Sequence, residues 1–274
     1  MSNPTLLVTQ RDAVTTITFN APEVRNAIDY NTMVQLRQAV EACTHNGTRC
    51  IIITGASGAE GAQPAFCSGL NIKRAIADGM TPDNVYKGLT ESFHPAMHAI
   101  RSAPMPVIAA VDGYAAGFGC DIALSCDLRL VTERARFGEL FIRMGLVPDG
   151  GGTYLLPRLV GLGRALELMF TGRDVLSDEA VRIGLANHII RHEVFEDEVF
   201  TFASDLARKS PEALRRGKAA MLGALDGDYR DALLHEAQHQ RDILASDDGM
   251  EGFSAFLQKR EPVWTTPTQS LPTN

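Results

Sequence analysis

The chain has 274 residues, of which 45% are hydrophobic and 22% are charged, a composition typical of a globular protein with a large buried core. Its 26 basic and 33 acidic residues give a net charge of −7, which excludes a general basic surface for nucleic acid or an anionic membrane. The first residues lack the pattern of a signal peptide, no apolar run approaches ~18 residues, and the five cysteines form no C-x-x-C pair. We therefore expect a cytoplasmic protein with reduced thiols and with no nucleic-acid or membrane partner.

Short runs rich in β-branched residues alternate with helical patterns through the first two thirds of the chain. The runs that predict strands are Leu6–Thr9, Val14–Phe19, Cys50–Thr54, Val107–Val111 and Leu128–Val131. The turn-like residues 10–12 between the first two runs predict an amino-terminal hairpin. Between them, Asp29 or Asn31 can cap one helix, and Pro82 begins another that continues toward Ile100. This alternation predicts an α/β fold in which most strands are parallel.

From about Ser177 onward the pattern becomes almost wholly helical. The expected helices are Asp178–Gly184, Val194–Lys209, Pro211–Leu225, Tyr229–Ala245 and Gly249–Lys259. A polar tail follows Trp264. We therefore divide the chain into a core at 1–195, a helical region at 196–264 and a tail at 265–274 that we expect to be disordered.

Two glycine-rich turns each follow an expected strand. One is FCSGLNI at 66–72, and the other is GYAAGFGCD at 113–121, which ends in the short carboxylate Asp121 at the start of an expected helix. Glycine permits close backbone approaches, and free N–H groups at a helix start attract negative charge. Together the turns could hold one carbonyl oxygen whose negative charge grows during a reaction, as an oxyanion hole does, or they could be tight turns without a ligand.

The motif HEAQH at 235–239 matches the zinc signature H-E-x-x-H. Leu233, Ala237 and Leu244 define the apolar face of the expected helix, and the two histidines point away from it, so we expect a solvated helix face and no metal site. The turn GFGCDI fails the dinucleotide fingerprint, because isoleucine stands where the third glycine is required. Neither a phosphate-binding loop nor a nucleophile elbow is present.

Asp149 lies in VPDGGGT, directly before three glycines and an expected helix. From the residues alone it can cap that helix or serve as an acid in a site. Asp121 can likewise be an acid in a site, or only a first-turn charge that offsets the dipole of its helix. These alternatives remain open at the level of single motifs.

Five blocks, taken in order, resemble the enoyl-CoA hydratase/isomerase (crotonase) family from about Leu6 to Trp264. The blocks are NAPEVRNAI (Asn20–Ile28), AFCSGLNIK (Ala65–Lys73), PVIAAVDGYAAGFGCDIALSCDLR (Pro106–Arg129), GLVPDGGGTYLLPRLVG (Gly145–Gly161) and GFSAFLQKR (Gly252–Arg260). The resemblance implies a crotonase-like spiral of β-β-α units with a carboxyl-terminal helical region. It also implies an acyl-CoA substrate without a further cofactor, and a homotrimer or a dimer of trimers.

In this family two backbone N–H groups hold the thioester oxygen, and by position they belong here to Leu70 and Phe118. Most relatives carry glycine where this chain has Phe118, so the oxyanion turn has an unusual side chain. The residues that the resemblance assigns to CoA binding are Arg25, Ala27, Ser68, Lys73 and Lys259. Lys259 lies in the carboxyl-terminal helix, where it can serve a neighbouring subunit or remain solvated surface.

Hydratases of the family use two glutamates, and this chain has Asp121 at the first position and Phe141 at the second. Adding water needs both a base and an acid, which argues against an efficient standard hydratase. Asp149 stands where isomerases of the family, including Δ3,Δ2-enoyl-CoA and 1,2-epoxyphenylacetyl-CoA isomerases, carry their catalytic acid. We therefore expect an acyl-CoA isomerase in which Asp149 shuttles the proton and Asp121 assists, with Glu139 as a weaker candidate.

Three other functions remain as alternatives. A 2-enoyl-CoA hydratase would use Asp121 with Asp149 or Glu139, a dehalogenase or hydrolase would use Asp149 as a nucleophile, and a non-catalytic relative would only bind CoA. The acyl chain is expected to contact parts of Ile76–Phe93, together with Phe141 and Met144.

Overall fold

The computed structural model describes residues 4–58, 61–265 and 271. Its strands are β1 (Leu6–Arg11), β2 (Val14–Phe19), β3 (Cys50–Gly55), β4 (Ala65–Cys67), β5 (Val107–Val111), β6 (Tyr114–Ala116), β7 (Leu128–Thr132), β8 (Arg136–Gly138), β9 (Val175–Leu176) and β10 (His188–Ile190). The expected tail at 265–274 lies largely outside the described residues, and its disorder remains a prediction.

Helices connect most of these strands and make up the carboxyl-terminal region. They are α1 (Tyr30–Ala42), α2 (Ile72–Ala77), α3 (Pro82–Gly88), α4 (His94–Ser102), α5 (Phe118–Ser125), α6 (Gly152–Val160), α7 (Leu162–Thr171), α8 (Ser177–Arg182), α9 (Phe195–Ala207), α10 (Pro211–Ala224), α11 (Tyr229–Leu244) and α12 (Asp247–Gln258). Shorter turns of helix are η1 (Pro22–Val24), the π-helical η2 (Leu89–Phe93), η3 (Leu140–Met144) and η4 (His192–Val194). None of the described helices is both long and apolar enough to span a bilayer.

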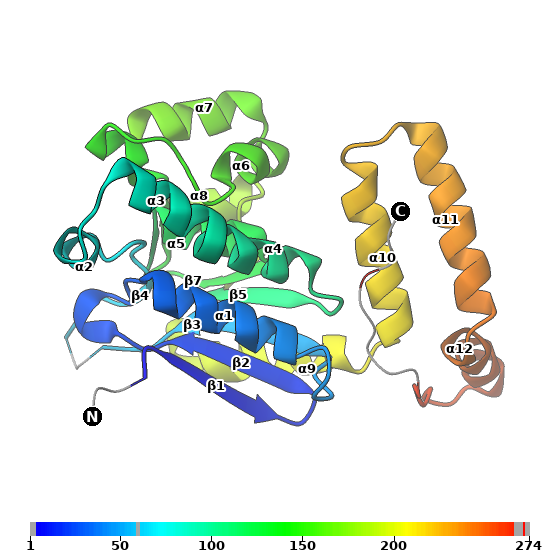
Figure 1. Cartoon of the computed structure of the whole chain (residues 1–274). Coiled ribbons are helices and arrows are strands. Elements are labelled where there is room, and N and C mark those ends of the chain that lie inside the picture. Colours follow the sequence, from blue (N-terminus) through cyan, green and yellow to red (C-terminus); the bar gives the residue numbers. More distant parts are fainter. Residues whose placement is uncertain (1–3, 59–60, 266–270, 272–274) are drawn as a thin grey trace.

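Within the described residues the strands form a six-stranded sheet in the order β1-β2-β3-β5-β7-β10 and a four-stranded sheet in the order β4-β6-β8-β9. All neighbours are parallel except β1 with β2 and β8 with β9. The predicted amino-terminal hairpin and the mainly parallel α/β fold are therefore confirmed. The two sheets with their covering helices agree with the expected crotonase-like spiral (Figure 1).

Several short strands differ from the sequence prediction. The expectation of an almost wholly helical chain after Ser177 is wrong at β10, which completes the edge of the larger sheet. Its residues His188 and Ile189 are exposed, so the strand shows no apolar alternation. The three-residue strands β4, β6 and β8 are too short to show any periodicity, yet they build the smaller sheet that carries the site.

The core follows from the alternation of side chains along the parallel strands. In β3, Ile51 and Ile53 belong to the main apolar cluster beneath α1 and α4, while Cys50 and Ile52 face a second cluster under α9. Helices thus cover both faces of the larger sheet, as parallel sheets require. The carboxyl-terminal helices α10, α11 and α12 extend away from this body to one side (Figure 1).

Candidate active site

The two predicted glycine-rich turns lie against each other. Gly69 follows β4 with a φ of 87°, and Gly117 follows β6 with a φ of 53°. A Cβ at position 69 would lie 2.8 Å from the carbonyl oxygen of Ala116 and 3.3 Å from the nitrogen of Phe118, so only glycine permits this approach. The segments that carry the two predicted donors therefore meet, although their role with a thioester remains a prediction.

Both predicted donors are available for a ligand. Neither the Leu70 N–H nor the Phe118 N–H donates a hydrogen bond within the described residues. Leu70 forms a parallel bridge with Ile28, in which Gly69 and Asn71 on either side of it make the backbone bonds. Phe118 begins α5 without a positive φ, so a residue with a side chain fits there and its backbone donor is preserved.

Asp121 lies in the first turn of α5 and has no exposed surface. The backbone N–H of Gly150 donates a 3.0 Å hydrogen bond to its Oδ2. A Cβ at Gly152 would lie 2.3 Å from Oδ1 of Asp121 and 3.0 Å from Oε1 of Glu139. The VPDGGGT turn therefore packs directly on α5, and the two carboxyls converge on its third glycine.

Asp149 belongs to the same turn but occupies a more open position. Its side chain is half-buried, and Oδ1 is buried without a hydrogen-bond partner among the described residues. Its backbone oxygen lies 2.8 Å from Nε2 of His94, which is exposed at the start of α4. The predicted acids Asp121, Glu139 and Asp149 are thus brought together, and the sequence prediction missed His94.

Burial and mutual repulsion set the protonation of these acids. Burial raises the pKa of Asp121 well above its ordinary value, and the negative charges of Glu139 and Asp149 reinforce that rise in pKa. Burial also raises the pKa of Glu139 to about 7, with Asp149 adding to it. The pKa of Asp149 is raised by burial, while the nearby His94 acts in the opposite direction. Carboxyls with such pKa values can give and take protons near neutral pH.

Phe141 confirms that the position of the second family glutamate is apolar. Its side chain is buried, and its ring tip lies 3.9 Å from the point that a Cβ at Gly117 would occupy. Glu139, two residues earlier at the end of β8, is 4% exposed and supplies the carboxyl beside Asp121 instead.

Aromatic rings surround the oxyanion turn on the side of α4. The ring of Phe118 meets Phe93 edge-on with a centroid separation of 4.7 Å, and Phe93 meets Tyr30 in the same way at 5.4 Å. Phe93 and Phe141, two of the residues expected near the acyl chain, are therefore placed beside the turn. Met144, expected to join them, has 54% of its surface exposed.

The structure brings together only part of the predicted CoA-binding set. The Ser68 backbone N–H donates to the carbonyl oxygen of Arg25 at 3.1 Å, and Ala27 lies two residues further along the same loop. Lys73 is exposed in α2, which begins four residues after Ser68, at Ile72. Lys259 ends α12 on the opposite side of the molecule (Figure 1), so it can reach this groove only from another subunit.

Two cavities outside the acid cluster were also found. One of about 510 Å³ is lined in part by Glu23 and Arg25, and Arg25 is one of the residues predicted to bind CoA. The other, of about 650 Å³, lies between α9 and the outer face of the larger sheet and includes none of the three acids. Because proton transfer needs acids within reach of the substrate, the larger cavity is not the reaction site.

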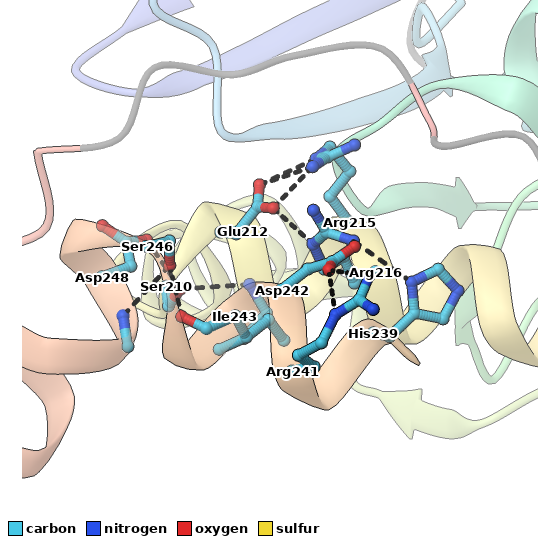
Figure 2. Close-up of polar contacts among 12 residues, drawn as sticks. Ser210, Glu212, Arg215, Arg216, His239, Arg241, Asp242, Ile243, Ser246 and Asp248 are labelled. Atoms are coloured by element: carbon cyan, nitrogen blue, oxygen red, sulfur yellow. Dashed lines mark hydrogen bonds and ion pairs between the residues drawn. The ribbon is translucent and has the colours of Figure 1, made fainter. Parts of the chain in front are cut away.

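The environment of the HEAQH motif differs from the solvated helix face that we expected. Figure 2 shows His239 turned toward α10, where its Nδ1 lies 3.3 Å from the Arg216 guanidinium. Leu233 and Leu244 on the expected inner face are instead 47% and 40% exposed. The polar face of this helix therefore packs on α10, through the Arg216–Asp242 ion pair and the Arg216–His239 contact, and its apolar stripe is exposed. Among the described residues, no three His, Cys, Asp or Glu side chains are grouped to hold a metal ion.

Comparison with known proteins identifies the family. The family model described as enoyl-CoA hydratase/isomerase matches residues 9–267. The chain is 33% identical to the crotonyl-CoA hydratase of Syntrophomonas wolfei over 95% of this chain and 98% of that protein, and 31% identical to the 2,3-dehydroadipyl-CoA hydratase of Escherichia coli over 94% and 97%. The structure resembles the enoyl-CoA hydratase of Mycobacterium smegmatis with a TM-score of 0.88 at 30% identity, covering 96% of this chain and 100% of that one. The chain belongs to the enoyl-CoA hydratase/isomerase family.

Proposed function

We propose that this enzyme shifts the double bond of a 3-enoyl-CoA thioester into conjugation, with Asp149 as the proton shuttle. The observation that carries the proposal is the position of the three acids. Asp121 is fully enclosed and is held by the Gly150 N–H, and Glu139 is 4% exposed, whereas the side chain of Asp149 is only half-buried. Asp149 is therefore the acid that a substrate in the cleft reaches most directly.

The chemistry follows from one carboxylate and one oxyanion hole. The Asp149 carboxylate removes a proton from carbon 2, and the electron pair moves to the thioester oxygen, which the Leu70 and Phe118 N–H groups stabilise. When the dienolate collapses, carbon 4 takes the proton back from Asp149 and the double bond forms between carbons 2 and 3. The raised pKa of Asp149 brings it closer to neutral pH, which makes the carboxyl a better base.

Hydration of a 2-enoyl-CoA is the second candidate, and two observations favour it. Asp121 and Glu139 converge on Gly152, so that an ionised and a protonated carboxyl could work as a pair without an acid at position 141. In addition, most of the similar proteins carry names that say hydratase. Those names belong to proteins that share between 29% and 35% of their residues with this chain.

Parallel assays of the two reactions test the proposal. The purified enzyme should convert 3-hexenoyl-CoA into the conjugated isomer faster than it consumes the conjugated absorbance of crotonyl-CoA. Asp149→Asn should reduce isomerisation at least ~100-fold, because the amide cannot carry the proton. A wild-type rate in this variant would refute the role of Asp149. Hydration that outpaces isomerisation, with a larger loss in Asp121→Asn or Glu139→Gln, would favour the hydratase.

A further inference from the structure

His94 joins two segments that lie 55 residues apart in the sequence. Its Nε2 lies 2.8 Å from the backbone oxygen of Asp149. A carbonyl oxygen only accepts, so Nε2 must carry the hydrogen and donate it. No described residue forms a hydrogen bond with the other ring nitrogen, Nδ1.

The local backbone explains why the ring reaches the acid turn. The five residues before His94 form the π-helical turn η2, and Pro95 follows as the second residue of α4. A π-turn inserts an extra residue into a helix and changes the direction of the side chains after it. Phe93, at the end of this turn, packs on Phe118 at the oxyanion turn, and the next side chain is thereby directed to Asp149.

Most charges around α4 are already paired or lie elsewhere. The charged groups on the elements packed against it are Arg37 and Glu41 of α1, Asp83 and Lys87 of α3, Glu91 of η2, Asp121 of α5, and His98 and Arg101 of α4 itself. Arg37 pairs with Glu41, Lys87 pairs with Glu91, and the Arg101 guanidinium lies over the Tyr154 ring. The His94 ring contacts the backbone oxygen of Asp149, and the Asp149 carboxyl is the acid whose pKa this histidine lowers.

We propose that His94 is a positioning residue for the acid that moves the proton, and this proposal rests on the role of Asp149 given above. Through Nε2–H it holds the VPDGGGT turn at the end of the substrate cleft. A positive charge on the ring, beside the turn, favours the carboxylate form of the Asp149 side chain, which is the form required of a base.

Loss of this charge has a defined effect on pH dependence. His94 lowers the pKa of Asp149 against the effect of burial. Without the imidazole, the pKa of Asp149 rises further, and the carboxylate forms only at higher pH. The acidic limb of the kcat/KM profile should therefore move to higher pH.

Three variants separate the hydrogen bond from the charge. His94→Leu removes both, His94→Gln retains an amide donor without a titratable charge, and His98→Gln changes an exposed histidine one turn further along α4. In 3-hexenoyl-CoA isomerisation, H94L should lower kcat ~10-fold or more with little change in KM, and both position-94 variants should move the acidic limb upward by about half a pH unit or more. H94Q should retain more of kcat than H94L, and H98Q should match the wild type.

The result that overturns the proposal is a wild-type acidic limb in H94Q and H94L while D149N is inactive. If H94L does not fold, as a thermal unfolding scan would show, the pH profile of H94Q decides the question. An active D149N would instead refute the proposed function, so the two failures are distinguishable.

Discussion

At the scale of single residues, we expect position 141 to determine whether a further acid lies beside the glycine-rich turn. Phe141 is buried beside the oxyanion turn, at the place where hydratases of the family carry a glutamate. Phe141→Glu should therefore raise hydration of crotonyl-CoA ~10-fold or more, because a second carboxyl can activate water while Asp121 or Asp149 supplies the proton. The measurement is the loss of conjugated absorbance, with the protein checked for folding because the buried carboxyl costs stability.

Phe141→Gln is the matched control, since it has the shape of glutamate without its proton chemistry. It should show no gain in hydration. Equal hydration rates in F141E and F141Q would mean that the aromatic ring limits hydration by blocking space, and that no missing acid is involved.

The sequence named three acids that the structure brings together, but it gave no sign of the histidine beside them. Asp121 and Asp149 lie in recognisable blocks, Glu139 lies between two of these blocks, and the structure groups the three acids as a cluster. His94 lies in no motif, and its contact with Asp149 depends on a π-turn that leaves no periodic signal. Candidate residues for chemistry could therefore be named from the sequence, whereas the contact between His94 and Asp149 could be seen only in the structure.

At the scale of elements, the cluster joins α5, the end of β8 and the turn before α6, so its protonation affects folding stability. Burial raises the pKa of Glu139 from an ordinary 4.5 to about 7. A carboxyl whose pKa is raised on folding stabilises the fold below the unfolded pKa, and this stabilisation is lost as the pH rises through the folded pKa. Between these two pKa values the loss from Glu139 alone is at most roughly 3 kcal/mol.

Glu139→Gln should therefore be less sensitive to pH than the wild type. Urea unfolding at about pH 5 and about pH 8 should show a larger fall in the midpoint for the wild type, because glutamine carries no charge to bury. Asp121 remains in both proteins and leaves part of the pH dependence in place. Glu236→Gln, at an exposed position of α11, is the control and should show the pH dependence of the wild type. If E139Q also showed the pH dependence of the wild type, ionisation of Glu139 in the folded protein would cost no stability.

Periodicity predicted most elements but assigned one helix face wrongly. The hairpin β1–β2, the cap Asp29 and the start of α3 at Pro82 all match, because each has a strong local signal. In α11 the apolar stripe faces outward and the polar face packs on α10. Glu212, buried on α10, binds both Arg215 and Arg216, and Arg216 continues to Asp242 of α11 at 3.0 Å (Figure 2). Such a network is not visible as a pattern in either helix.

At the scale of the whole molecule, the carboxyl-terminal helices leave much apolar surface uncovered. The side chains that are more than half exposed in α10–α12 include Met221, Tyr229, Leu234, Met250, Phe253, Phe256 and Leu257. Exposed apolar residues gathered on one region mark an interaction surface. Lys218 of α10 anchors these helices to the body through a 2.7 Å ion pair with Asp127. The helices are thus held outward, where they can meet another subunit.

This surface leads to a prediction about assembly and about Lys259 together. We expect the enzyme to be a homotrimer or a dimer of trimers, joined through α10–α12, and light scattering after size-exclusion chromatography measures this mass. Phe256→Asp should shift the assembly to smaller species. The Phe256 ring is 81% exposed in the single chain and would be buried favourably in the interface, whereas burial of the aspartate charge there would cost free energy.

Gln238→Asp, which adds the same charge at a polar position of α11, should leave the assembly intact.

Because Lys259 lies three residues after Phe256, the dissociated variant should also bind acyl-CoA more weakly if a partner subunit supplies that cation. Lys259→Gln should then raise KM without changing the mass of the wild-type assembly. If F256D had the same mass as the wild-type assembly, the interface would not include Phe256. If K259Q had an unchanged KM, Lys259 would be a solvated surface residue with no part in CoA binding.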